Sequence, residues 1–314
     1  MSAQSIMWAA FGLLMVVMLA IDLGMNRKAH TVSFRQALTW SIVWVSLALT
    51  FNAGIYVFLG QTKALEFFTG YIIEKSLSVD NLFVFIMIFA YFKIRVEHQA
   101  RILKWGILGA LVLRALFIFI GIGLLTYFHW LFYLFGVLLL YTAWKMAFGG
   151  QEEVHPDTNL LVKLARKLFP FTKRVRGDWF FKRRNGLLVA SPLFLALVMV
   201  ESSDVLFAID SIPAIFAVTL DPFIVFTSNI FAIMGLRALY FLLASVMGMF
   251  VYLKLGISSI LAFVGGKMIA TAMGFHIPIQ VSLGVIFTCL AMSILASLII
   301  GRKRAKQAIS IKNK

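Results

Sequence analysis

The sequence predicts an all-α, polytopic membrane protein with about nine transmembrane helices in a single domain over residues 1–314. Hydrophobic residues make up 61% of the chain and charged residues 13%, whereas soluble domains have roughly 45–50% and 25%. Apolar runs of about 20 residues, the length that a helix needs to cross a bilayer, recur along the whole chain. The single cysteine, Cys289, excludes both an intrachain disulfide and a thiolate metal cage.

The predicted helices follow these apolar runs in order. The stretch before the first run contains no Lys or Arg, so it lacks the basic region of a signal peptide, and we expect the first run to remain as a helix. A basic loop at 148–186 separates the fifth helix from the sixth. The expected helices cover residues 7–25, 38–59, 66–92, 102–123, 127–147, 187–217, 222–248, 255–275 and 278–300.

The net charge of +16 is explained by the distribution of Lys and Arg among the predicted loops. Nearly all of them fall on the side shared by the 148–186 loop and the C-terminal tail, whereas the opposite side has Lys63 alone. Because Lys and Arg retain loops in the cytoplasm, we expect the N-terminus outside and the C-terminus in the cytoplasm. The basic excess then needs no nucleic-acid partner. We expect the loop, with an amphipathic stretch at 159–169, to rest on the lipid bilayer.

The chain also contains an internal duplication. Three motifs recur in the same order at a nearly constant offset, and together they define two copies, 66–147 and 187–275. Each copy holds three helices, an odd number, so the second copy must enter the membrane from the opposite face. Inverted repeats are typical of secondary transporters, whose site lies near the midplane at the repeat interface; a duplicated scaffold that transports nothing is the alternative. The matching motifs are DNLFV (80–84) with DVLFA (204–208), LRALF (113–117) with LRALY (236–240), and KM (145–146) with KM (267–268).

Acidic residues interrupt several of the predicted helices. A charge at mid-membrane costs roughly 2.5–3.5 kcal/mol, so such residues usually face a partner or an aqueous path. The acids within the predicted spans or near their ends are Asp22, Glu74, Asp80, Glu201, Asp204 and Asp210.

The spacing of these acids restricts how they can act together. Glu201 and Asp204 are three residues apart and share a helix face. Asp210 lies six residues after Asp204, and Glu74 lies six residues before Asp80. Six residues turn a helix by about 240°. We therefore expect either a helix break between the members of each pair or two separate sites.

The helix at 187–217 favours a break. As a straight helix it would measure about 46 Å, against about 30 Å of hydrocarbon. Pro213 has no N–H, so the carbonyl of Ile209 loses its helical partner beside Asp210. A break there would release backbone oxygens as cation ligands, as happens in broken-helix transporters.

Ion pairing is the alternative explanation for some of the acids. Each copy supplies one Asp and one Arg, and we expect Asp80 to pair with Arg114 and Asp204 with Arg237. Such pairs can be purely structural. Lys75 and Lys267 could pair with further acids.

The oxygen-rich composition of this region indicates a hard divalent cation. Carboxylates, amides, hydroxyls and backbone carbonyls suit Mn²⁺, Mg²⁺ or Ca²⁺. The five histidines fall in loops or near helix ends, which argues against an imidazole-rich site for zinc or copper. The candidate metal ligands are Glu74, Asp80, Asn81, Glu201, Asp204 and Asp210, with Thr227 and Ser203 as supporting oxygens. The candidate ion-pair or gating residues are Arg114, Arg237, Lys267 and Asn229.

Three long segments resemble the signature segments of the TerC family, and most closely its bacterial Alx branch: TGYIIEKSLSVDNLFVF (69–85), VESSDVLFAIDSIPAIFAV (200–218) and FTSNIFAIMGLRALYFLLA (226–244). The similarity extends over nearly the whole chain. It implies a multi-pass protein of the bacterial inner membrane that exports Mn²⁺ as its transported substrate, without an organic cofactor. The family's acidic positions would correspond to Glu74, Asp80, Glu201, Asp204 and Asp210. The sequence does not define an oligomeric state.

We expect alternating access around a midplane carboxylate site, with protons exchanging on the same carboxylates. A tellurite or oxyanion carrier is an alternative, because Arg114 and Arg237 could hold an anion, although the acids would repel it. A membrane scaffold of a metal-stress complex, docking a partner on the 148–186 loop, is another. An intramembrane aspartyl protease would need two close carboxylates, but its G-x-G-D motif is absent from the sequence, so we expect no enzymatic activity.

Overall fold

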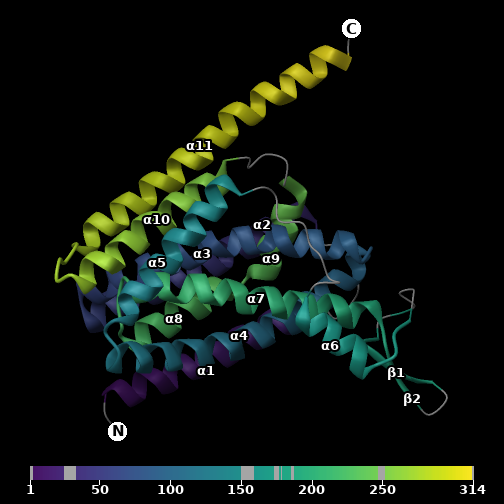
Figure 1. Cartoon of the computed structure of the whole chain (residues 1–314), viewed down its shortest axis with the longest axis horizontal. Coiled ribbons are helices and arrows are strands. Elements are labelled where there is room, and N and C mark those ends of the chain that lie inside the picture. Colours follow the sequence, from purple (N-terminus) through teal and green to yellow (C-terminus); the bar gives the residue numbers. More distant parts are fainter. Residues whose placement is uncertain are drawn as a thin grey trace.

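The computed structural model describes residues 3–24, 33–149, 159–172, 177, 179–184, 187–246 and 252–312. These residues form a bundle of helices with one small β-hairpin (Figure 1). Parts of the 148–186 loop, together with Arg27, Lys28, His30 and His155, lie outside the described residues. The elements in chain order are α1 (Ala3–Gly24), α2 (Phe34–Leu59), α3 (Gln61–Tyr91), α4 (Val96–Tyr127), α5 (Leu131–Phe148), α6 (Leu160–Leu168), β1 (Phe181–Arg184), β2 (Leu187–Ala190), α7 (Pro192–Phe216), α8 (Pro222–Ile233), α9 (Leu236–Val246), α10 (Leu253–Ala272) and α11 (Ile279–Lys312).

The protein is an all-α, multi-pass membrane protein with six helices long and apolar enough to cross a bilayer among the described residues, or seven if the bent pair α8–α9 is one span. Nine spans were expected. The apolar part of α1, Ile6–Asp22, is shorter than a full span. The helix α3 is long enough, but it carries Glu74, Lys75 and Asp80 within a few turns, so it is less apolar than an ordinary span. The six clear candidates are Phe34–Leu59, Val96–Tyr127, Leu131–Phe148, Pro192–Phe216, Leu253–Ala272 and Ile279–Ser297.

The expected helix breaks in α3 and α7 are not present. Both helices are continuous, and α7 runs through Pro213 to Phe216. Because Pro213 lies in the last turn of α7, the missing N–H costs one hydrogen bond at the helix end and leaves the central turns intact. The break occurs instead within the expected span 222–248, where α8 and α9 meet at an angle of 43°. Gly235 makes the corner with a φ of +77°, a conformation that favours glycine.

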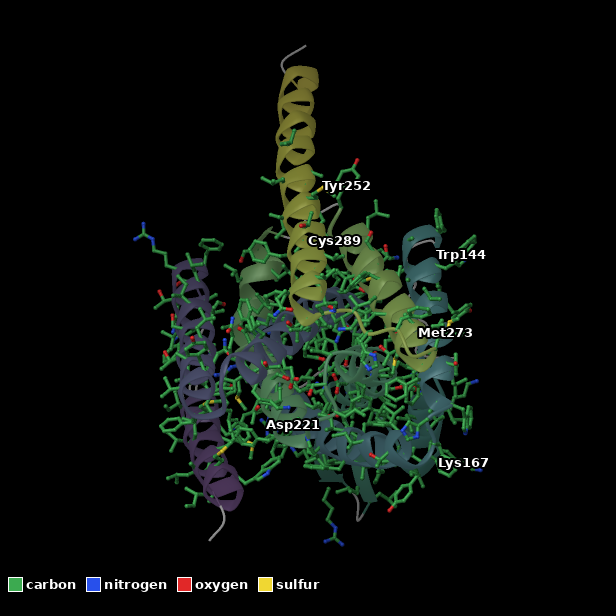
Figure 2. All side chains as sticks on the ribbon, turned by 90° about the vertical axis from the view of Figure 1, so that its left-hand side faces the viewer. Trp144, Lys167, Asp221, Tyr252, Met273 and Cys289 are labelled. Carbon is green, nitrogen blue, oxygen red and sulfur yellow. The ribbon has the colours of Figure 1, made fainter. Side chains whose placement is uncertain are left out.

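Four helices form the centre of the bundle. The helix α3 packs against α7 and α8, and α4 packs against the same two helices. On one flank, α1 and α2 close the centre with a cluster of aromatic rings; Phe51 of α2 lies 4.7 Å from Phe231 of α8, and Trp8 of α1 lies 5.2 Å from Phe223, measured between ring centroids. On the other flank α5 packs against α10, and α11 packs along α10 and extends past the bundle (Figures 1 and 2).

Two glycines allow α5 and α10 to come into backbone contact. A Cβ atom added at Gly265 would lie 2.9 Å from the backbone oxygen of Gly136, and one added at Gly136 would lie 2.9 Å from the oxygen of Gly265. Any larger residue at either position would push the two helices apart. Small residues at such crossings are typical of membrane helix pairs, which associate through close packing.

The described part of the 148–186 loop forms a compact unit at one end of the bundle (Figure 1). The helix α6 confirms the expected amphipathic stretch; it begins at the N-cap Asn159, whose Oδ1 accepts a hydrogen bond from the Val162 backbone N–H. The strands β1 and β2 pair antiparallel, with Phe181 opposite Ala190. This hairpin was not predicted, although Asn-Gly at 185–186, between the strands, is a strong sequence signal for one.

Candidate functional site

Arg114 lies near the middle of the longest apolar stretch of α4. It follows Lys104 by ten residues and precedes the helix end at Tyr127 by thirteen, about 15 Å and 20 Å along the axis. Its side chain is 1% exposed. A guanidinium buried this deeply is costly unless carboxylates and hydrogen-bond acceptors surround it.

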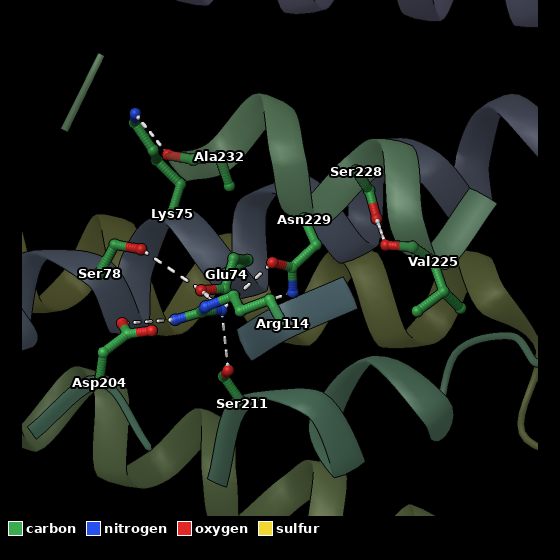
Figure 3. Close-up of polar contacts among 10 residues, drawn as sticks. All are labelled: Glu74, Lys75, Ser78, Arg114, Asp204, Ser211, Val225, Ser228, Asn229 and Ala232. Carbon is green, nitrogen blue, oxygen red and sulfur yellow. Dashed lines mark hydrogen bonds and ion pairs between the residues drawn. The ribbon is translucent and has the colours of Figure 1, made fainter. Parts of the chain in front are cut away.

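The surrounding acceptors come from three other central helices, as Figure 3 shows. Arg114 Nη1 donates to Glu74 Oε1 of α3 and, at 3.1 Å, to Ser211 Oγ of α7. The same atom lies 3.3 Å from Asn229 Oδ1 of α8, and Nη2 lies 3.5 Å from Asp204 Oδ1 of α7. One guanidinium therefore ties together α3, α4, α7 and α8, and it joins an acid of α3 with an acid of α7.

Glu74 has further partners. Asn229 Nδ2 donates to its Oε2 at 3.3 Å, and Ser78, one turn later on α3, donates to its Oε1 at 3.4 Å. The Glu74 and Asn229 residues are both fully buried. Sequence reasoning identified Glu74, Arg114 and Asn229, but it missed Ser78 and Ser211. The sign that could have identified these serines is their position on the helix faces that carry Glu74 on α3 and Asp204 on α7.

Two buried polar atoms of this cluster have no hydrogen-bond partner among the described residues. They are Asp204 Oδ2 and Arg114 Nε. Almost all buried polar atoms in proteins are hydrogen-bonded, so each exception needs an explanation. Here one carboxylate oxygen at the centre of the bundle keeps its full capacity to accept a hydrogen bond or a cation.

Glu201 lies one turn before Asp204 on α7 and also faces α4. A Cβ atom added at Gly109 would lie 2.1 Å from Glu201 Oε1, so the carboxylate occupies the space that this glycine leaves open. The residue is half-buried. Among the described residues its carboxylate makes no hydrogen bond or ion pair. Glu201 is thus an acid without a hydrogen-bond or ion-pair partner in the described part of the chain. It lies beside Gly109, nearer than Arg114 to the charged N-terminal end of α4.

The other candidate ligands point elsewhere or stand apart. Asp210 Oδ1 accepts a hydrogen bond from Thr142 Oγ1 of α5 at 2.9 Å, so Asp204 and Asp210 serve different helix interfaces. Asp80 is half-buried and Asn81 is buried, both beyond Glu74 on α3. Within the described part of the chain, no group of three or more His, Cys, Asp or Glu side chains is placed to hold a metal ion. The helix break that the spacing allowed is absent, and Asp204 and Asp210 contact different helices.

One of the two expected ion pairs is wrong, because Asp204 pairs with Arg114 and not with Arg237. Arg114 also pairs with Glu74. Arg237 donates to the backbone oxygen of Asp22 and lies 3.5 Å from its Oδ1. The reason is the bend after α8, which carries Arg237 on α9 away from the centre and toward α1.

Two lysines bind neutral oxygens within the bundle. Lys267 Nζ of α10, buried, donates to Ser282 Oγ of α11 at 2.9 Å. Lys75 Nζ donates to the backbone oxygens of Ala232, at 3.0 Å, and Met234, at 3.4 Å. These carbonyls are freed by the break between α8 and α9, and the negative end of the α8 dipole favours a cation there. Free carbonyls at a broken helix were expected, but near Asp210 and not here.

A cluster of acidic and basic side chains lies at the N-terminal end of α3, around the start of the expected span 66–92. Lys63 Nζ lies 2.9 Å from Glu66 Oε2 and 3.0 Å from Asp221 Oδ2. Burial alone would lower the pKa of Lys63, but its hydrogen bonds to Glu66 and Asp221 outweigh burial and raise that pKa. Thr219 also donates to Glu66. Lys63 therefore stays charged and links the starts of α3 and α8.

The chain is closely related to several bacterial membrane proteins. It is 52% identical over 297 residues to an uncharacterised membrane protein of Myxococcus xanthus, which covers 94% of this chain and 93% of the relative. It is 48% identical over 312 residues to proteins of Salmonella typhi and Escherichia coli K12, which are provisionally named membrane-bound redox modulator Alx; each alignment covers 96% of this chain and 97% of the relative. No solved structure matches the chain.

Residues 59–305 match the family described as integral membrane protein TerC. This region runs from the start of α3 into α11 and contains Arg114 with its hydrogen-bond partners Glu74, Asp204, Ser211 and Asn229. The family match and the full-length relatives agree with each other, and both confirm the resemblance that the signature segments indicated. The chain therefore belongs to the TerC family of integral membrane proteins.

Proposed function

We propose that this protein is a secondary transporter that exports a divalent metal cation, Mn²⁺, across the bacterial inner membrane. The observation that carries the proposal is the pairing of Glu74 and Asp204, from the two halves of the duplicated sequence, with the single guanidinium of Arg114 at mid-membrane. Two carboxylates that share one guanidinium carry an excess negative charge, which a cationic cargo could balance. A duplicated structural scaffold would be expected to balance its buried charges without an unpartnered oxygen such as Asp204 Oδ2.

In this proposal the cargo and the guanidinium of Arg114 compete for the carboxylates of Glu74 and Asp204. Binding of the metal would require Arg114 to move aside and the carboxylates, Asn229 and neighbouring hydroxyls to turn toward the ion. Oxygen ligands of this kind suit Mn²⁺, Mg²⁺ and Ca²⁺. Exchange of protons on the same carboxylates offers a route to coupling.

Glu201 would then be the first ligand that cargo meets from the cytoplasm. It lacks a partner, it is half-buried, and it lies between the charged start of α4 and the Arg114 cluster. An acid that is free and partly accessible can capture a hydrated cation before the buried acids do. Export as the direction rests on the family resemblance alone.

The proposed repeats are supported by how the helices pair. If α3, α4 and α5 correspond to α7, α8–α9 and α10, the main contacts between the two halves form matching sets. The first helices α3 and α7 pack together, as do the third helices α5 and α10; α3 packs on α8 and, reciprocally, α7 packs on α4. A two-fold relation between the halves predicts this pattern. The topology, with the N-terminus outside, remains a proposal from the distribution of Lys and Arg.

The provisional name of two relatives raises a redox role. A thiol–disulfide reaction within one chain needs two cysteines, and this chain has only Cys289. An indirect effect, in which metal export changes the redox state of the cell, is compatible with transport. An oxyanion carrier is less well supported, because Arg114 is already bound by two carboxylates.

The direct test is Mn²⁺ flux through the purified protein in liposomes. Glu201→Gln removes one anionic ligand and keeps the shape of the side chain, so we expect flux to fall about tenfold or more, the effect of about 1.4 kcal/mol. The matched control is Glu97→Gln, an exposed acid in the first turn of α4, which should leave flux unchanged. Full flux in Glu201→Gln, or stabilisation of the protein by tellurite and not by Mn²⁺, would contradict the proposal.

A further inference from the structure

The helix α6 has three faces of different chemistry. At about 100° per residue, its nine residues divide the circumference into three arcs. One arc, Val162 and Ala165, is buried. The second arc carries exposed cations, Lys163, Arg166 and Lys167. The third arc carries exposed leucines, Leu160, Leu161, Leu164 and Leu168, with exposed fractions between 42% and 78%.

The buried arc packs on the start of α7. Asn159 Nδ2 at the start of α6 donates to Ser202 Oγ at 2.7 Å, and Phe169 just after its end lies 6.1 Å from Phe194, measured between ring centroids. The two helices are therefore antiparallel, and α6 covers the first three turns of α7. Figure 1 shows α6 beside the start of α7 and next to the hairpin.

This position coincides with the boundary between the charged and apolar parts of α4. A Cβ atom added at Gly106 would lie 3.0 Å from Val200, so these two residues are level with each other. Lys104 lies just before Gly106, and no charged residue follows on α4 until Arg114. The α6 segment therefore lies where the bundle passes from headgroups into hydrocarbon. A helix at that level meets acyl chains on one side and headgroups on another.

The neighbouring hairpin has the same character. Its exposed side chains include Phe181, Leu187 and Leu188, beside the exposed cations Lys182 and Arg183. The ring of Phe181 packs against Phe194 of α7 at a tilt of 51°, with 4.4 Å between centroids, so the hairpin and α6 are anchored to the same turn. Apolar and basic side chains at the same level fit an anionic bilayer surface better than an aqueous one.

We propose that α6 is a membrane-surface helix that inserts its leucine face between lipids and binds anionic phospholipid headgroups through its basic face, and that the bond from Asn159 to Ser202 transmits this attachment to α7. Ser202 is adjacent to Glu201 and two residues from Asp204. The lipid composition would thus influence the position of the helix that carries the acids. The proposal stands apart from metal transport, since a scaffold of the same structure could bind lipid in the same way.

The insertion of the leucine face can be tested by cysteine labelling, because Cys289→Ser gives a background without cysteine. In that background we compare Leu164→Cys with Lys167→Cys, which lies on the same helix but on the basic face. In nanodiscs of phosphatidylcholine and phosphatidylglycerol, a water-soluble maleimide should label Lys167→Cys readily and Leu164→Cys much more slowly. Equal labelling would overturn the proposal, and would be expected if this face serves a protein partner that is missing from the purified sample.

The headgroup preference needs a second measurement that does not depend on flux. Phosphatidylglycerol should raise the melting temperature of the wild type above that in pure phosphatidylcholine. Lys163→Gln with Lys167→Gln should lose most of this gain, whereas Lys182→Gln with Arg183→Gln on the hairpin should keep more of it. Asn159→Ala should keep the slow labelling at position 164 but lose part of the thermal gain. A gain that is the same in all variants, or absent in the wild type, would overturn anionic lipid binding by α6.

Discussion

Arg114 shows how one side chain can define a site. Its guanidinium offers a planar set of donors, which bind acceptors on α3, α7 and α8. The acids and Arg114 could be identified from the sequence, because ionisable residues within apolar runs are rare and conspicuous. Their pairing could not, because partners on different helices depend on how those helices rotate and bend. The misassigned pair of Asp204 with Arg237 is the clearest example.

At the residue scale we predict that Gly109→Ala impairs transport without impairing folding. The added methyl group would overlap the Glu201 carboxylate. This group is the free end of a flexible side chain, so it can move away at little cost in stability. Glu201 would then leave its position beside α4, and we expect Mn²⁺ flux in liposomes to fall several-fold with an unchanged melting temperature.

The control is Gly123→Ala on the same helix, where an added Cβ atom meets nothing within 4 Å. That variant should match the wild type in flux. If Gly109→Ala transports as well as Gly123→Ala, the position of the Glu201 carboxylate is unimportant for transport.

The bent pair α8–α9 shows which features of the helices could be predicted from the sequence. Its apolar residues predicted a helix, but nothing local predicted the bend. The helices and the amphipathic α6 follow from apolar periodicity, which is a local property of the sequence. The break at Gly235 has long-range causes. The side chain of Trp44 from α2 occupies the space beside Gly235, and Lys75 from α3 binds the carbonyls that the break frees. Pro213 is a stronger local sign of a helix break than Gly235. Because it lies in the last turn of α7, it does not interrupt that helix.

We predict that Gly235→Ala destabilises the protein strongly. The new Cβ atom would lie 2.5 Å from the Trp44 ring, and the φ of +77° is unfavourable for alanine. Backbone strain of about 1–2 kcal/mol and overpacking of about 1–3 kcal/mol should add up in a lower melting temperature in detergent.

Gly274→Ala separates these two causes, because Gly274 has a φ of +90° but open space around it. Gly274→Ala should lose only the stability that corresponds to backbone strain, which is the smaller of the two contributions. Equal losses in the two variants would mean that Trp44 yields and does not enforce the corner.

For the whole molecule, the contact between α5 and α10 joins the two proposed halves. The backbones meet at Gly136 and Gly265, where neither helix has a side chain that could move aside. The sequence shows that Gly136 and Gly265 are small residues in apolar helices, but it does not show that they lie at a helix contact. Which of the neighbouring Gly265 and Gly266 faces α5 depends on the rotation of α10 in the assembled bundle.

We expect Gly265→Ala to lower the melting temperature and Gly266→Ala to leave it unchanged or raise it slightly. Alanine at Gly265 would press on the backbone oxygen of Gly136, whereas alanine at Gly266 meets nothing within 4 Å and has the better helix propensity by about 1 kcal/mol. Unfolding of the two variants in the same detergent measures the difference. Equal stability would show that α5 and α10 can separate freely.

The retention of Arg114 inside the bilayer also has an electrical consequence for the proposed cycle. After the metal has left, the carrier must return with Glu74 and Asp204 still in place. With the guanidinium between them, that returning centre holds one net negative charge, where two bare carboxylates would hold two. A charge that crosses the whole field costs about 2.3 kcal/mol per 100 mV. The reset of the carrier should therefore respond less steeply to the membrane potential than it would if Glu74 and Asp204 returned without Arg114.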